Sequence, residues 1–133
     1  MSTLGHFMQD LAKEMGVSFQ VQDGVYSMDM PTMDGRCQLV NVTVQESGIG
    51  GEMLLFYTPV GPMTEDIDLR DLLELNIGST VYARVGIVAE HIVVAAGQML
   101  DSADVSEVIA MLAEVGAMGD MLEKHYFGQE DRF

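Results

Sequence analysis

Basic residues are scarce in this chain. Of its 133 residues only 6 are Lys or Arg, against 21 Asp or Glu, so the formal net charge is −15. A field of this sign repels nucleic-acid phosphates and anionic lipid headgroups. We therefore expect no nucleic-acid partner and no membrane partner, whereas basic or amphipathic protein segments would be attracted.

Cysteine and long apolar runs are scarce as well. Cys37 is the single cysteine, which excludes an intrachain disulfide and a cysteine-based metal site. It lies in an apolar, strand-like run, so we predict a buried, inert thiol. The longest nearly uncharged stretch, 92–100, is far too short to span a bilayer, and the N-terminal residues do not resemble a secretory signal. A cytoplasmic location is the resulting prediction.

Motifs that carry catalysis or bind metal ions are missing. His6, His91 and His125 are widely separated in sequence, and no His-x-x-x-His pair exists. No serine lies in a nucleophile elbow, and the glycine-rich segment 48–51 lacks the Lys-Ser/Thr that follows a phosphate-binding loop. We predict no catalytic residue, no metal site and no cofactor, and hence a protein that is not an enzyme.

The first half of the chain has clear periodicity. A helix is predicted from residues at helical spacing between a cap at Ser2 or Thr3 and Gly16, namely Leu4, Phe7, Met8, Leu11, Ala12 and Met15. A short extra strand is possible at 17–21. Further strands are predicted from Tyr26 to Pro31, over 36–45 and over 52–57, the last ended by Pro59, Gly61 and Pro62.

The second half predicts a helix from Leu69 that stops at 76–78, then strands over 80–88 and 91–99 around a tight turn at Ala89-Glu90. A long helix follows, capped by Asp101, Ser102 or Asp104. The predicted fold class is α+β: a single domain over 1–133 in α-β-β-β-α-β-β-α order, with a twisted antiparallel sheet and helices packed on it.

Two further features distinguish this chain from an average domain. Methionine occurs 12 times, and several of these residues are at positions compatible with exposure: Met28, Met30, Met33, Met63, Met118 and Met121. Exposed, they would give an adaptable contact surface; the alternative is that they fill ordinary gaps in the core. Gly116 and Gly119 lie one turn apart in the last helix. They permit close approach either of the chain's own sheet or of a second copy.

The segment Leu72–Gly78, the hairpin of 82–100 and the ending Met121–Gly128 resemble the type III secretion chaperone-like superfamily, which includes CesT-type chaperones and YbjN-like proteins. The resemblance implies a homodimer without catalytic activity that holds an extended or partly unfolded segment of a partner protein. The alternative is a YbjN-like sensory or regulatory protein that acts through protein contacts without secretion substrates.

Candidate residues follow for both interactions. Contact with the partner segment is predicted for Met28, Met30, Met33, Met53, Leu55 and Phe56. The homodimer is predicted to use the hairpin and the last helix, through Val85, Ile87, Val115 and Met118.

Overall fold

The computed structural model describes residues 3–128, so the predicted cap Ser2 lies outside the described residues. The element order is α-β-β-β-β-α-β-β-α, and the possible extra strand is present as the first one. The elements are α1 (Thr3–Met15), β1 (Phe19–Gln22), β2 (Val25–Pro31), β3 (Cys37–Glu46), β4 (Glu52–Pro62), α2 (Leu69–Gly78), β5 (Arg84–Val88), β6 (His91–Met99), a short 3-10 turn (Leu100–Ser102) and α3 (Val105–Phe127).

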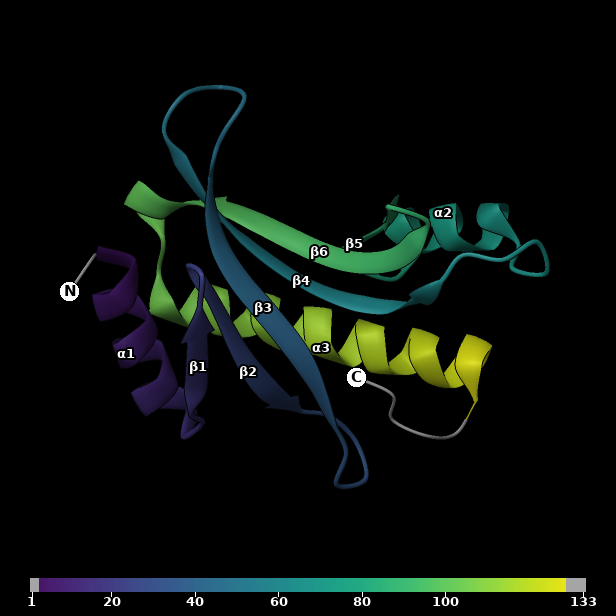
Figure 1. The fold of residues 1–133 in the computed structure, drawn as a ribbon, viewed down its shortest axis with the longest axis horizontal. Coiled ribbons are helices and arrows are strands. Elements are labelled where there is room, and N and C mark those ends of the chain that lie inside the picture. Colours follow the sequence, from purple (N-terminus) through teal and green to yellow (C-terminus); the bar gives the residue numbers. More distant parts are fainter. Residues whose placement is uncertain (1–2, 129–133) are drawn as a thin grey trace.

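The six strands form one antiparallel sheet in the order β1-β2-β3-β4-β6-β5. The sheet is strongly twisted: β4 and β6 run lengthwise along α3, whereas β3 crosses that helix steeply (Figure 1). This confirms the predicted α+β class and the twisted antiparallel sheet.

The end of β4 differs from its prediction. The strand continues through Pro59 and Gly61 to Pro62, because the register against β6 shifts between Pro59 and Gly61. A bulge leaves one residue out of the ladder, which allows proline to lie within a paired strand. Pro59 therefore marks an irregularity within β4, whereas Pro62 is its last residue.

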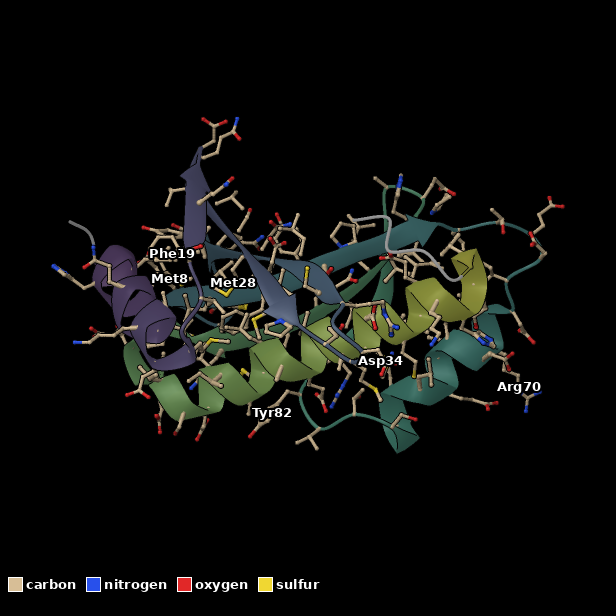
Figure 2. The ribbon with its side chains drawn as sticks, turned by 90° about the horizontal axis from the view of Figure 1, so that it is seen from below. Met8, Phe19, Met28, Asp34, Arg70 and Tyr82 are labelled. Carbon is tan, nitrogen blue, oxygen red and sulfur yellow. The ribbon has the colours of Figure 1, made fainter. Side chains whose placement is uncertain are left out.

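All three helices lie against the same face of the sheet, called here the covered face. Met28, Val40, Phe56 and Val94 point to this face and are fully or almost fully buried. Figure 2 shows Met8 of α1 close to Met28, with Phe19 of β1 beside them. The opposite face, called here the bare face, has no helix of the described residues over it.

Two glycines let α3 approach the sheet closely. A Cβ atom at Gly119 would lie 2.6 Å from Cγ2 of Thr58, and one at Gly116 would lie 3.1 Å from Cβ of Met30. Both distances are shorter than ordinary carbon contacts, so a side chain at either position would push the helix away. Of the two explanations that the sequence leaves open, the structure supports packing on the chain's own sheet.

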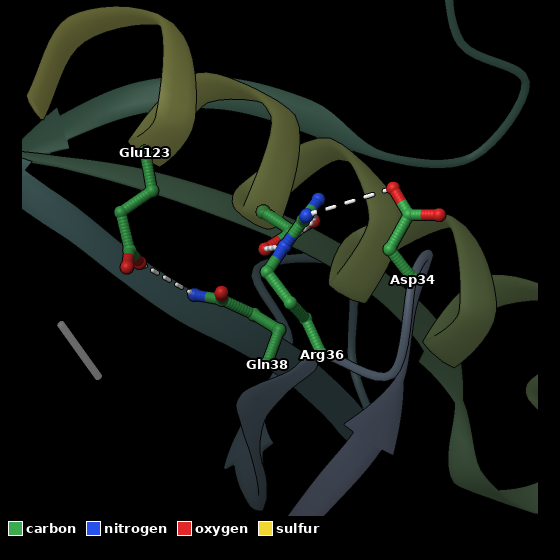
Figure 3. A network of polar contacts seen from close by, with 5 residues as sticks. Asp34, Arg36, Gln38 and Glu123 are labelled. Atoms are coloured by element: carbon green, nitrogen blue, oxygen red, sulfur yellow. Dashed lines mark hydrogen bonds and ion pairs between the residues drawn. The ribbon is translucent and has the colours of Figure 1, made fainter. Parts of the chain in front are cut away.

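A polar network fixes the C-terminal half of α3 to the sheet (Figure 3). Arg36 donates from Nη2 to Oδ2 of Asp120 over 2.7 Å and from Nε to both carboxylate oxygens, an arrangement that fixes orientation as well as distance. Deeper inside, Nε2 of Gln38 donates to Oγ1 of Thr58 and to Oε2 of Glu123, and all three side chains are buried. The network specifies which turn of α3 lies over β3 and β4.

The expectation for Cys37 is wrong, because its side chain is exposed at the start of β3. Cys37 is followed by Gln38, whose side chain is buried on the covered face, so the alternation of the strand directs Cys37 to the bare face. An apolar run therefore does not establish burial at a strand end.

Candidate protein-binding surfaces

The predicted contact methionines divide between the interior and the surface. The expected exposure of Met28, Met30 and Met118 is wrong, since all three lie in the core between the sheet and the helices. Met33 is 71% exposed in the β2–β3 turn, and Met121 is exposed on α3. Met63 is half-buried. Three of the six methionines that could have formed a contact surface therefore lie in the core.

The three residues proposed on β4 also divide, because alternate side chains of a strand point to opposite faces. Phe56 points to the covered face and is fully buried, so it has no surface for a partner. Met53 and Leu55 point to the bare face and are half-buried. Leu55 lines a broad hollow on that face, and this hollow is the first candidate surface.

The hollow, called here the trough, has a volume of about 620 Å³. Its lining comes from five neighbouring strands and is mainly apolar: Val25 of β2, Thr43 and Gln45 of β3, Leu55, Tyr57 and Pro59 of β4, His91, Val93 and Ala95 of β6, and Val88 of β5. In a flat sheet, five adjacent strands would separate Val25 from Val88 by about 19 Å. Their presence around one hollow shows that the bare face is concave.

The charge of the trough differs from that of the whole chain. None of its lining residues is Asp, Glu, Lys or Arg, although the protein carries 21 acidic residues. Glu46 and Glu90 are sequence neighbours of the lining residues Gln45 and His91. The trough is thus a neutral, apolar depression in an acidic molecule, which is the usual character of a contact site.

A second apolar surface lies where α2 meets the edge strand β5. It comprises the exposed side chains of Leu69, Leu73, Ile77, Val81, Tyr82 and Ile87, called here the α2–β5 surface. Leu69, Leu73 and Ile77 are spaced by four residues and form one stripe of the helix, while Leu72 points inward and anchors α2 to the core. Tyr82 points outward in Figure 2.

The edge of β5 beside this surface is closed by a side chain. Asn76 of α2 donates from Nδ2 to the carbonyl of Val85, and the N–H of Val85 donates to Oδ1 of Asn76 over 2.7 Å. The amide side chain therefore takes the place of a neighbouring strand at Val85. A further chain cannot pair with this residue unless Asn76 moves.

Glu114 of α3 holds the segment before β5. Its carboxylate accepts hydrogen bonds from the backbone N–H groups of Val81, Tyr82 and Ala83, at 2.9, 2.7 and 2.6 Å. Partial burial opposes the charged form, but these three donors and nearby Arg84 outweigh burial and place the pKa of Glu114 below its ordinary value. The predicted strand over 80–88 accordingly begins only at Arg84, because residues 81–83 bind a carboxylate instead of a strand.

The predicted dimer residues are mostly unavailable for contact. Val85, on β5 beside α2, and Val115 and Met118, on α3, are buried within the protomer, so they offer little surface to a second copy. Ile87 is exposed and belongs to the α2–β5 surface. The sequence pattern did not single out Leu73, Ile77 or Val81 for contact, although the four-residue spacing of the α2 stripe is visible in it.

Within residues 3–128, no group of three or more His, Cys, Asp or Glu side chains is arranged to hold a metal ion. None of the helices in that range is long and apolar enough to cross a membrane.

No protein-family model and no curated protein matches the sequence. The fold, however, is similar to solved structures of type III secretion chaperones. SycH of Yersinia pestis, solved in complex with a stable fragment of YscM2, matches with a TM-score of 0.56 and 14% identity over 83% of this chain and 91% of that chain. SchA in the HopA1–SchA chaperone–effector complex matches with a TM-score of 0.58 and 16% identity over 84% and 88% of the two chains. The fold is therefore that of the type III secretion chaperones.

Proposed function

We propose that this protein is a non-enzymatic, chaperone-like binding protein that holds an extended or partly unfolded segment of a partner protein. The observation that carries the proposal is the trough, an uncharged apolar hollow on a sheet face that no described helix covers. A fold shared with chaperones that were solved with partner proteins supports it. A cytoplasmic location is part of the proposal.

We further propose a homodimer formed through the α2–β5 surface. Six exposed large apolar side chains within 69–87 support this, and Leu69, Leu73 and Ile87 among them line one hollow between α2 and β5. Scattered single exposures are ordinary, whereas grouped ones mark an interaction site. A twofold interface uses the same patch on both copies, so one stripe of apolar side chains on α2 with its neighbours on β5 suffices to form it.

Site-specific photo-crosslinking tests the partner site. A photoreactive phenylalanine analogue at Leu55, in the trough, is expected to capture one predominant protein in cells of the source organism. The same analogue at Met33, an exposed apolar residue in the β2–β3 turn, serves as the control. Equal crosslinking from both positions, or none from either, contradicts the proposal. A regulatory protein as the captured partner would favour the YbjN-like alternative.

Light scattering after size exclusion tests the homodimer. The wild-type protein is expected to have twice the protomer mass at micromolar concentration, and Leu73→Asp is expected to be monomeric. Ile49→Asp adds the same charge at an exposed position in the β3–β4 turn and is expected to stay dimeric. A monomeric wild-type protein contradicts this part of the proposal without affecting the trough.

A further inference from the structure

We infer that a pocket between α2 and α3 binds a short aliphatic amine in its cationic form. The pocket shares no residue with the trough or with the α2–β5 surface. It is lined by Asp71 and Leu75 of α2 and by Met121, Leu122, His125 and Tyr126 of α3. Its volume of about 320 Å³ is near the lower end of the range for small-molecule sites, so the ligand is small.

Helical spacing brings the lining residues together. Asp71 and Leu75 are four residues apart on α2, and Met121 and His125 are four residues apart on α3, so each pair lies on one helix face. Tyr126 contacts His125 edge to face, with the ring centroids 4.6 Å apart. Figure 2 shows α2 beside the C-terminal turns of α3, where the two faces meet around the pocket.

The charge acting on the pocket is negative. Asp71 is exposed, and none of the ion pairs among the described residues involves its carboxylate. Burial raises the pKa of the Tyr126 hydroxyl above its ordinary value, and the negative charges of Asp71 and Asp68 raise it further. The field of both carboxylates therefore reaches a group that lines the pocket, and the same field attracts a cation.

The helix ends do not reverse this sign. The last turn of α3 carries roughly half a negative charge and the first turn of α2 roughly half a positive one, so the two nearly cancel. Asp68 and Asp71 then leave the balance negative, and the net charge of the chain, −15, has the same sign. Lys124 lies in the last turn of α3, but it is exposed and does not line the pocket.

The apolar part of the lining determines the rest of the ligand. Leu122 is almost completely buried, Leu75 is half-buried, and the flexible thioether of Met121 adapts to the shape of a bound group. A bare metal ion would leave this apolar surface without a contact. An ammonium group on a short alkyl chain matches both parts, because the charge is placed near Asp71 while the chain covers the leucines.

Two-dimensional amide NMR of the isotope-labelled protein tests the inference. Pentylamine, added at neutral pH and constant physiological ionic strength, is expected to shift the amide signals of residues 71–75 and 121–126 until they saturate. Pentanol has the same chain without the charge and is expected to bind at least about tenfold more weakly. Ammonium chloride, the charge without the chain, is expected to give no saturable shifts there.

Matched variants test the role of Asp71. Asp71→Asn keeps the size and removes the charge, and it is expected to weaken pentylamine binding at least about tenfold. Asp71→Glu restores the charge and is expected to recover most of the affinity. Asp29→Asn removes an equal charge from an exposed position on the bare face of β2 and is expected to change the affinity less than about twofold. The same spectra show whether each variant is folded.

Three results would overturn the inference. Shifts that spread over the acidic surface without saturating would mean that the amine acts only as a counterion. Equal affinities for pentylamine and pentanol would mean that the hollow does not recognise charge. Unchanged binding by Asp71→Asn would place the amine elsewhere. Each of these leaves the proposed partner site and homodimer unaffected, because neither includes a residue of this pocket.

Discussion

The covered and bare faces of the sheet are made by the same strands, and both carry apolar side chains. On the covered face, Phe56 and Val94 are completely buried beneath α3. On the bare face, the adjacent residues Leu55 and Val93 are shielded only by neighbouring strands and remain half-buried. Antiparallel sheets with one solvated face usually carry polar residues there. The difference shows that β4 and β6 serve the core with one face and leave apolar side chains uncovered by any described helix on the other, which supports the proposed partner site.

The largest expected effect is at Phe56. Phe56→Ala removes a fully buried ring beneath α3 and is expected to lower the free energy of unfolding by about 3–5 kcal/mol. Leu55→Ala, one residue away on the bare face, is expected to cost less than about 1.5 kcal/mol because less area returns to water. Urea denaturation of both variants measures the difference.

Similar decreases in the free energy of unfolding for Phe56→Ala and Leu55→Ala would contradict the difference between the two faces, since they would mean that the bare face contributes to the core. In that case the trough would be covered in solution. The same two variants should rank in the opposite order for binding of the partner protein, with Leu55→Ala the weaker binder.

A smaller effect is expected at Gly119. In Gly119→Ala the new Cβ would lie 2.6 Å from Thr58 Cγ2, and Thr58 is held by its hydrogen bonds to Gln38 and to the Leu39 carbonyl. We expect the free energy of unfolding to fall by about 1–2 kcal/mol in total, because the clash outweighs the gain in helix propensity of about 1 kcal/mol.

The matched control for Gly119 is Gly86→Ala on the bare face. A Cβ atom at Gly86 meets no heavy atom within 4 Å. Substitution there is expected to be neutral or to stabilise by up to about 1 kcal/mol, because the unfolded chain loses freedom. Thermal unfolding of both variants compares a covered position with an open one, and Gly119→Ala is expected to have the lower midpoint. Equal midpoints would show that α3 can shift without losing stability.

The third prediction concerns the link from α3 to the α2–β5 surface. Glu114→Gln weakens three hydrogen bonds to a charged acceptor and is expected to cost about 1–2 kcal/mol at neutral pH, at the lower end because the carboxylate is partly exposed. Glu65→Gln removes an equal charge from an exposed loop and is the control. Unfolding free energies from urea titrations measure both.

The effect of Glu114 should depend on pH in a defined direction. Its folded pKa is lower than the ordinary value of 4.5, so its stabilisation is complete above that value and declines as pH falls through the folded pKa. The difference between wild type and Glu114→Gln should therefore be constant near pH 7 and shrink in acid below pH 4.5. A difference that grows in acid would contradict the assigned role.

Periodicity predicted the elements well where it was strong. The helical spacing in α1 and the alternation in β2 gave those elements to within a residue or two. In β4, by contrast, four consecutive apolar residues from Met53 to Phe56 show no alternation. The sequence therefore could not assign Leu55 and Phe56 to different faces, because only the neighbouring strands and α3 decide which side is covered.

Two errors have a different cause. In β2, Asp29 between Met28 and Met30 already favours both methionines facing inward, but their flexibility was interpreted as surface adaptability. Glu114 was not identified because it acts on residues more than thirty positions away. Contacts of that range depend on how α3 lies beside α2, which no local pattern encodes.

The hydrogen bonds between Asn76 and Val85 also bear on how many copies can associate. Open-ended growth by strand addition requires two exposed edges on each molecule, one to add to and one to offer. Here the β5 edge is occupied at Val85, whereas β1 at the other end of the sheet has a single neighbour, β2. A chain with an obstructed edge adds strands less readily there, so the Asn76 side chain would hinder open-ended growth through β5.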